Sequence, residues 1–130
     1  MPYFTVRRHA ELPAVITWLS AEYNTREYYP AYDAALRGLL DSLEEPVHLI
    51  TDTRPLTMNF ADLVRGLANT STGSDPLTRH PMIRQIMVVT TDPLIDFGAK
   101  ALEREEYGHV KVAVVATLED AFAAIRGAAQ

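Results

Sequence analysis

Residues 46–64 read PVHLITDTRPLTMNFADLV, and the rest of the chain can be placed around them. The apolar, β-branched run at residues 47–52 is typical of a buried strand. An Arg-Pro pair then breaks the strand with a loop. Asn59 has the side chain and the position of a helix N-cap, with Asp62 three residues later. In open α/β sheets, ligands and regulatory groups gather where a strand leads into the next helix, so the search for a functional site starts here.

The composition is that of an ordinary globular protein, with 48% hydrophobic and 22% charged residues. A chain of 130 residues supports one core, so we expect a single domain over residues 1–130. The net charge of −5 argues against a nucleic-acid partner, because phosphate binding needs a basic field. The absence of Cys excludes disulfides and thiolate chemistry. No apolar run is long enough to span a bilayer and no signal peptide precedes the first strand pattern, so we expect a cytoplasmic protein.

The N-terminal part of the sequence predicts a hairpin followed by a helix. Residues 3–8 alternate and residues 14–19 are apolar on both faces, so the two segments most simply pair as antiparallel strands. Thr25 has the character of a helix cap. Pro30, however, falls in the first turns, where it loses a hydrogen bond and clashes with the preceding turn. Two alternatives follow: residues 26–29 form a loose turn, or the regular helix starts at Pro30.

The second half of the sequence predicts alternating strands and helices. Asp92 followed by Pro is a strong helix start signal, and Thr117 with Asp120 forms a capping box. The other expected elements are a helix from Phe60 to about Asn69, a polar loop from Asn69 to Asp75, a helical turn closed by His80 and Pro81, a strand from Ile83 to Thr90, a helix ended by Tyr107 and Gly108, and a strand from Val110 to Ala116. The order β-β-α-β-α-β-α-β-α indicates an α/β fold with a mixed, mostly parallel five-stranded sheet and an N-terminal antiparallel hairpin.

No motif in the sequence assembles a catalytic or metal site. Gly-rich phosphate loops and the Gly-x-Ser-x-Gly elbow are absent, and none of the four histidines has a local metal-pair spacing. Asp52 and Asp92 both end parallel strands, where two carboxylates can bind a cation or share a proton, but Asp92 is already explained as a helix cap. We therefore predict no catalytic residue, no cofactor and no metal.

Two side-chain clusters each allow two interpretations. The Ser/Thr-rich residues 70–74 are either a phosphate acceptor or a flexible polar loop. Four tyrosines concentrate in one region and are either a partner patch or the edge of the core. These are Tyr23, Tyr28, Tyr29 and Tyr32.

The element order, together with the strand–loop–helix unit from Asp52 to Asp62, resembles the STAS domain of anti-sigma-factor antagonists, the SpoIIAA-like domains. The sequence is most similar to small, uncharacterised bacterial SpoIIAA-like proteins. Residues 76–83, which precede a Val-rich strand, and residues 116–121, which open the last helix, resemble segments of those proteins. The resemblance covers nearly the whole chain and lies mostly in the pattern of elements.

In the antagonists, an Asp-Ser-x-Gly motif starts the second helix, and a partner kinase phosphorylates its serine. Here Asn59 lies near the aspartate of that motif and is followed by Phe60 and Ala61, so the serine and the glycine are both missing. Thr57 lies just before the cap, but it takes the serine's role only in a shifted register. The resemblance therefore implies a module without the phosphoserine switch.

These features predict a non-catalytic regulatory or protein-interaction module of STAS type, with an unidentified protein as its partner. The alternative is a small carrier of a lipophilic ligand, since related folds include lipid-binding modules. An enzyme is not expected, because no base, nucleophile and orienting group converge in the sequence. The predicted interaction surface consists of Asp52, Arg54, Thr57, Met58, Asn59 and Phe60.

The last strand predicts two unequal sheet faces. Val110, Val112 and Val114 mark one face as core, whereas the face with Lys111, Ala113 and Val115 is smaller and partly polar. Together with the outer side of the first strand, this second face predicts a weak two-fold homodimer, with a monomer as the alternative.

Overall fold

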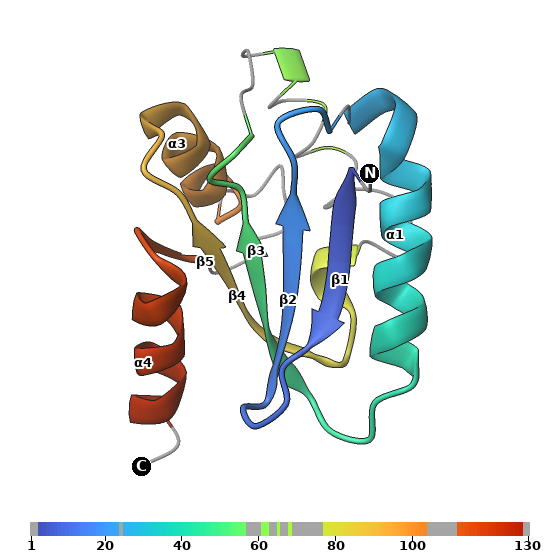
Figure 1. Ribbon diagram of the computed structural model, residues 1–130, viewed down its shortest axis with the longest axis vertical. Coiled ribbons are helices and arrows are strands. Elements are labelled where there is room, and N and C mark those ends of the chain that lie inside the picture. The colour runs from blue at the N-terminus through green and yellow to red at the C-terminus, as the bar shows by residue number, and fades with distance from the viewer. Residues whose placement is uncertain are drawn as a thin grey trace.

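The computed structural model describes residues 3–23, 25–56, 61, 62, 65, 68, 77–103 and 112–128 (Figure 1). The described chain is an α/β structure around a five-stranded sheet. Its elements are β1 (Phe4–Arg8), β2 (Ala14–Leu19), α1 (Thr25–Asp41), β3 (Val47–Asp52), the 3₁₀ turn η1 (Leu77–Arg79), β4 (Ile83–Val89), α3 (Pro93–Ala101), β5 (Val112–Val115) and α4 (Leu118–Ala128). The predicted strands and the fold class are confirmed.

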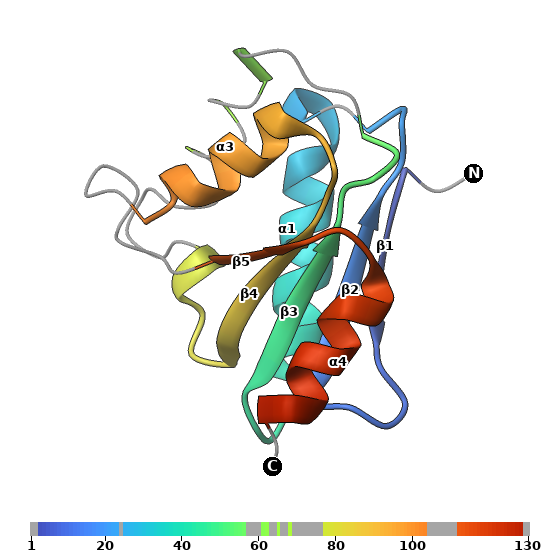
Figure 2. The same ribbon diagram turned by 90° about the vertical axis from the view of Figure 1, so that its left-hand side faces the viewer.

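The strands lie in the sheet in their chain order, β1-β2-β3-β4-β5. β1 pairs antiparallel with β2, in the predicted hairpin, and the other neighbours pair in parallel. The carboxyl ends of β2, β3, β4 and β5 therefore meet at one edge of the sheet, where α3 and the start of α4 also lie (Figure 2). We call this edge the carboxyl edge.

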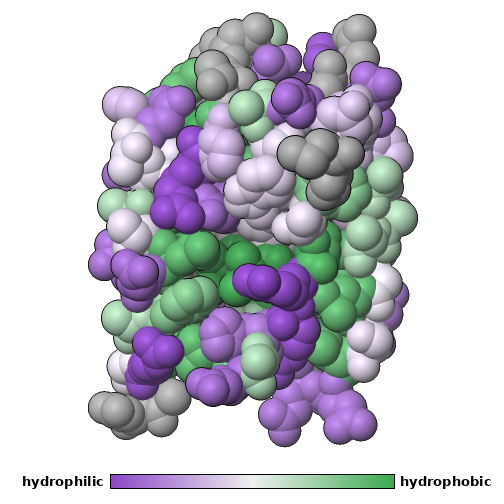
Figure 3. All heavy atoms as spheres, viewed as in Figure 1, coloured by the Kyte–Doolittle hydropathy of each residue, from purple (hydrophilic) through white to green (hydrophobic). Residues whose placement is uncertain are grey.

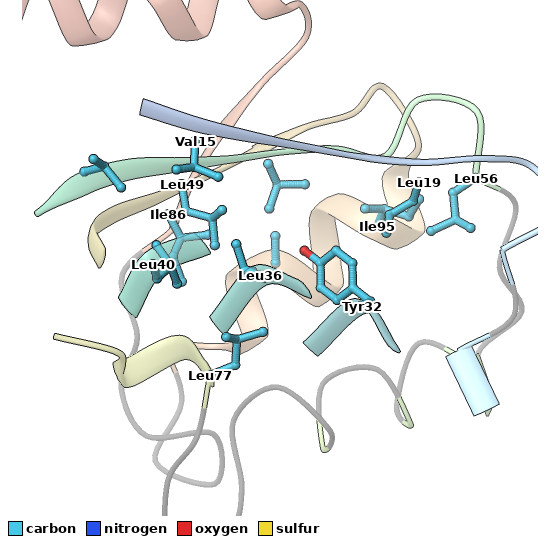
Figure 4. Packing of buried hydrophobic residues seen from close by; sticks show 13 residues of the cluster. Val15, Leu19, Tyr32, Leu36, Leu40, Leu49, Leu56, Leu77, Ile86 and Ile95 are labelled. Atoms are coloured by element: carbon cyan, nitrogen blue, oxygen red, sulfur yellow. The ribbon is translucent and has the colours of Figure 1, made fainter. Parts of the chain in front are cut away.

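The two faces of the sheet are covered by different helices. On the first face, Leu36 and Leu40 of α1 and Ile95 of α3 pack against side chains such as Leu49 of β3 (Figure 4). On the second face, α4 contributes Ala121 and Ile125 to a smaller core; the strands supply Ala14, Ile16, Ile50, Met87 and Val89. This division agrees with the predicted difference between the two faces.

The prediction for the start of the first helix was wrong in both of its alternatives. α1 begins at Thr25 and continues through Pro30. Pro30 is the sixth residue of the helix and lacks the N–H that would bond to the carbonyl oxygen of residue 26, and the helix continues in spite of this loss. Aromatic packing stabilises these first turns: the Tyr28 ring stacks on Tyr3, and Tyr29 lies 6.1 Å from Tyr32 between ring centroids.

The helix after β4 also ends earlier than predicted. α3 ends at Ala101, whereas the expected stop at Tyr107 and Gly108 lies outside the described residues. The N–H of Leu102 donates to the carbonyl oxygen of Ala99, three residues back, at 3.3 Å, and the next N–H repeats this spacing. Hydrogen bonds of this 3₁₀ type tighten the last turn and end the helix.

The helix predicted to follow β3 is described at four positions, Ala61, Asp62, Arg65 and Ala68, and all four are helical. Its predicted cap, Asn59, and the polar loop at residues 69–75 lie outside the described residues.

Candidate functional site

The carboxyl edge carries a polar or charged side chain after each parallel strand. Ser20 follows β2, Asp52 ends β3, Thr90 follows β4 and Thr117 follows β5. The arrangement follows from the parallel pairing, which places the ends of successive strands side by side. Open α/β sheets bind ligands outside the carboxyl ends of the strands, at the point where the strand order reverses. The order here does not reverse, so the edge is a candidate through its polar side chains alone.

Asp52 is buried, with 2% of its surface exposed, and it forms an ion pair with Arg54. The Asp52 carboxylate accepts hydrogen bonds from the Nε and Nη2 atoms of Arg54, at 2.9 and 2.8 Å, and from the Arg54 backbone N–H at 3.1 Å. These bonds raise the pKa of Arg54, and the charge of Glu119 at the start of α4 adds to the effect. The pair fixes one edge of the guanidinium and leaves the Nη1 edge outside the bidentate contact.

The loop that carries Arg54 is held at both ends. The Thr53 hydroxyl donates to the carbonyl oxygen of Val89 at 2.9 Å, and the Thr53 backbone N–H reaches the same oxygen. The Leu56 N–H donates to the carbonyl oxygen of Thr53, and the Leu56 side chain is buried in the first-face core (Figure 4). The 43% exposed side chain of Arg54 therefore projects from a rigid turn.

Asp92 is a helix cap, as predicted. Its side chain accepts a hydrogen bond from the backbone N–H of Leu94, and its own N–H donates to the hydroxyl of Thr90. Each of the two carboxylates at the carboxyl edge thus has its own local partner: a guanidinium for Asp52 and a helix N-terminus for Asp92. Nowhere in the described residues do three or more His, Cys, Asp or Glu side chains come together as metal ligands.

The structure brings together two of the six residues of the predicted interaction surface. Asp52 and Arg54 are in direct contact. The other four, Thr57, Met58, Asn59 and Phe60, lie outside the described residues, as does the Ser/Thr cluster at residues 70–74.

Two histidines have structural partners that sequence reasoning missed. The Nε2 of buried His80 lies 2.7 Å from a carboxylate oxygen of Asp41, and its Nδ1 accepts a hydrogen bond from the N–H of Met82. The ring proton is therefore on Nε2, and His80 joins the end of α1 to the start of β4. The Nδ1 of His48 lies 3.2 Å from the Oε1 of Gln85. Burial lowers the pKa of His48 below the ordinary 6.5, and the hydrogen bond with Gln85 opposes this effect.

The tyrosine cluster mainly edges the core. Tyr32 is buried and donates a hydrogen bond to the hydroxyl of Thr17 at 3.1 Å, while Tyr23 and Tyr29 pack against the same core. At the surface, Tyr28 stacks on Tyr3 with ring centroids 4.2 Å apart, and a hydrogen bond between the two raises the pKa of Tyr28 to about 12. One feature of the sequence could have indicated the contact between Tyr32 and Thr17: Thr17 lies in the middle of an otherwise apolar strand.

Helices that combine the length and the apolar character needed to cross a bilayer are absent from the part of the chain that the structure describes.

No protein-family model matches the chain, and no curated protein matches its sequence. The structure is similar to a crystal structure, that of an uncharacterised protein from the DUF3478 family with a SpoIIAA-like fold, from Shewanella loihica PV-4. The match covers 94% of this chain and 91% of that one, with a TM-score of 0.61 and 10% sequence identity. The chain therefore has the SpoIIAA-like fold that its element order predicted, and at this identity the likeness concerns the fold alone.

Proposed function

We propose that this SpoIIAA-like chain is a single, non-catalytic STAS-type module that binds another protein through the loop after β3 and the start of the following helix. The proposed surface consists of Asp52, Arg54, Thr57, Met58, Asn59 and Phe60. A fold by itself does not carry a function, so the proposal depends on the site.

The observation that supports it most directly is the Asp52–Arg54 pair. A buried carboxylate holds the guanidinium in one orientation, on a turn held at both ends, at the edge of the sheet where binding sites form. An arginine whose orientation is already fixed loses less side-chain entropy on binding, and arginine is enriched at protein interfaces. Such a surface is suited to recognition, whereas the described residues form no acid–base or nucleophilic constellation around it.

We further propose that the module works without a phosphoserine switch. In the antagonists of similar fold, Ser follows the aspartate of the motif. In this sequence Phe60 follows Asn59, and Ala61 comes next, so no hydroxyl group occupies the position of that serine. Incubation with candidate serine kinases and phosphopeptide mapping should find no phosphate on residues 59–62. A phosphopeptide at Thr57 would instead mean that the switch is kept in a shifted register. The cytoplasmic location stays a prediction.

The interaction surface can be tested by quantitative affinity capture from the source cells. Proteins enriched by the wild type should be lost with Met58→Ser/Phe60→Ser and reduced with Arg54→Lys, which keeps the charge but not the planar fork. Arg84→Lys, on the exposed side of β4, is the matched control and should retain them. If folded variants at Met58 and Phe60 capture the same proteins as the wild type, the proposed surface is wrong.

A further inference from the structure

β1 forms one edge of the sheet, and no described element covers that edge. The strand is the first in the sheet order and pairs with β2 alone. In Figure 1 it lies at the front of the molecule, with α1 and α4 on either side of it. Figure 2 shows the same strand at the margin of the sheet, with α4 in front of the sheet and α1 behind it. The outer edge of β1 is therefore open within the part of the chain that the structure describes.

The backbone groups of this edge are unpaired at alternate residues. At the two ends of the hairpin, the carbonyl oxygen of Tyr3 accepts a hydrogen bond from the chain opposite, and the N–H of His9 donates one. In the antiparallel register, these bonds place the hydrogen-bonded pairs at the odd-numbered residues of β1. The N–H and C=O groups of Phe4, Val6 and Arg8 therefore point away from β2, and they have no backbone partner among the described residues.

The side chains of β1 differ between its two faces. Phe4 and Val6 point to the first face and pack, partly buried, against its core. Thr5 and Arg7 point to the second face and are exposed. Figure 3, in the same view as Figure 1, shows a band of hydrophobic residues across the middle of this surface, with hydrophilic residues above and below it. A strand added to β1 would therefore have apolar neighbours on one face and polar neighbours on the other.

The charges on the strand itself are positive. Arg7 is exposed and makes no ion pair within the described ranges of the chain. The guanidinium of Arg8 donates to backbone carbonyl oxygens of the hairpin turn, which carry no full charge to neutralise it. Arginines on an edge strand oppose its pairing with an identical edge, because both strands would bring positive charges to the same ribbon. The same charges attract a strand of opposite sign.

We infer that β1 binds an extended acidic segment of another protein, which joins the sheet as a further strand antiparallel to β1. The backbone of this segment pairs with the outward N–H and C=O groups of Phe4, Val6 and Arg8. Its residues opposite these three direct apolar side chains to the first face. Its residues opposite Thr5 and Arg7 are acidic and lie on the second face. In strand addition of this kind, the main-chain bonds supply the affinity and the alternating side chains supply the specificity.

The net charge of −5 does not exclude an acidic partner. At physiological ionic strength, charges more than about 8 Å apart are largely screened from each other when they are exposed to solvent. A segment paired with β1 lies next to Arg7, so this arginine interacts with it more strongly than acidic residues on distant parts of the surface.

The inference can be tested with the peptide acetyl-Thr-Val-Glu-Val-Glu-Val-Thr-amide, titrated into the isotope-labelled chain and followed by NMR. The amide resonances of β1 should shift saturably, with a dissociation constant of about 0.1–1 mM. Lysine in place of glutamate should weaken binding by at least about tenfold. N-methylation of the valines removes the N–H groups that face β1 and should abolish binding. N-methylation of the glutamates, whose N–H groups point away from β1, should change the affinity by less than about twofold.

Two variants of the chain test the same contacts. Val6→Pro removes an N–H that β2 does not use, so it should weaken binding by at least about tenfold while the circular dichroism spectrum stays unchanged. Arg7→Glu should weaken binding of the glutamate peptide by at least about fivefold and strengthen binding of the lysine peptide. Arg84→Glu, at an exposed position of β4, is the matched control and should bind the glutamate peptide like the wild type.

The comparison of the two N-methylated peptides uses the unchanged protein, so it decides the result even if Val6→Pro does not fold. The absence of saturable shifts in β1 up to about 5 mM peptide would overturn the inference. Binding that tolerates N-methylation of the valines would equally overturn it, because such binding would not use the backbone of β1. Equal binding of the glutamate and lysine peptides would overturn the acidic character of the partner.

Discussion

Replacing Arg54 by Ala should destabilise the protein more than replacing its buried partner Asp52 by Asn, although Arg54 is the more exposed of the two. Asp52 is 2% exposed, and its carboxylate receives three hydrogen bonds from Arg54, two of them from the guanidinium. Arg54→Ala removes those two and leaves a buried negative charge. Breaking a buried ion pair in this way costs about 3–5 kcal/mol, and the 43% exposure of Arg54 places the expected value near the lower limit, at about 3 kcal/mol.

Asp52→Asn should cost only about 1 kcal/mol, because an amide oxygen of the same shape still accepts a hydrogen bond from Arg54 and no buried charge remains. The double variant should cost about 1.5 kcal/mol and so be more stable than Arg54→Ala alone. The coupling between the two changes is then about 2.5 kcal/mol.

Urea unfolding followed by the fluorescence of the single tryptophan and by circular dichroism measures all four forms. Arg84→Ala serves as the control for the loss of an exposed arginine and should cost less than about 0.5 kcal/mol. Additive costs for the two single variants, or a double variant less stable than Arg54→Ala, would refute the reasoning that Arg54 neutralises a buried charge.

Three other substitutions test separate features. Asp92→Ala should cost about 1 kcal/mol by removing the N-cap of α3, and a several-fold larger loss in urea unfolding would mean that Asp92 holds more than the helix end. Trp18→Ala should cost about 2 kcal/mol, below the 3–5 kcal/mol of a fully buried indole, because Trp18 is partly exposed; an unchanged thermal midpoint would contradict its packing. The pKa of His48 is lowered in the folded state, so the unfolded state binds more protons and stability falls as the pH drops through 6.5 toward the folded pKa. His48→Gln should remove this part of the pH dependence, and identical pH profiles for the two proteins would show that His48 is not responsible.

The strands and the helix caps at Asp92 and Thr117 were predictable because their signals are local. Asp92 binds an N–H group two residues away, and Thr117 accepts one from Asp120, three residues away. Such contacts depend on only a few consecutive residues. Pro30 shows the limit of local reasoning: its cost is real, but the ring of Tyr3, just before β1, and rings from the rest of α1 stabilise the turns around it.

The position of Asp52 at the end of a strand was predictable from the sequence, but its contacts were not. The strand pattern placed Asp52 at the end of β3, where sites form. Its burial and its bidentate contact with Arg54 depend on the turn that follows, and that turn is held by Val89, 36 residues beyond Thr53. The contact between His80 and Asp41 spans 39 residues in the same way. Propensity and periodicity describe neighbours along the chain, so contacts of this kind appear only in the folded structure.

The order of the strands in the sheet has a consequence for the synthesis of the protein. Because the spatial order equals the chain order, each strand after β1 pairs with the strand made just before it. During translation, a new strand therefore leaves the ribosome when its neighbour is already available, and no strand has to be inserted between two others. The sheet can grow from the hairpin toward β5, and only one unpaired edge advances at a time. Release of the chain before β5 is made would leave β4 as the edge strand. The incomplete product would then expose the unpaired backbone of Met87, Val88 and Val89, the apolar carboxyl end of β4.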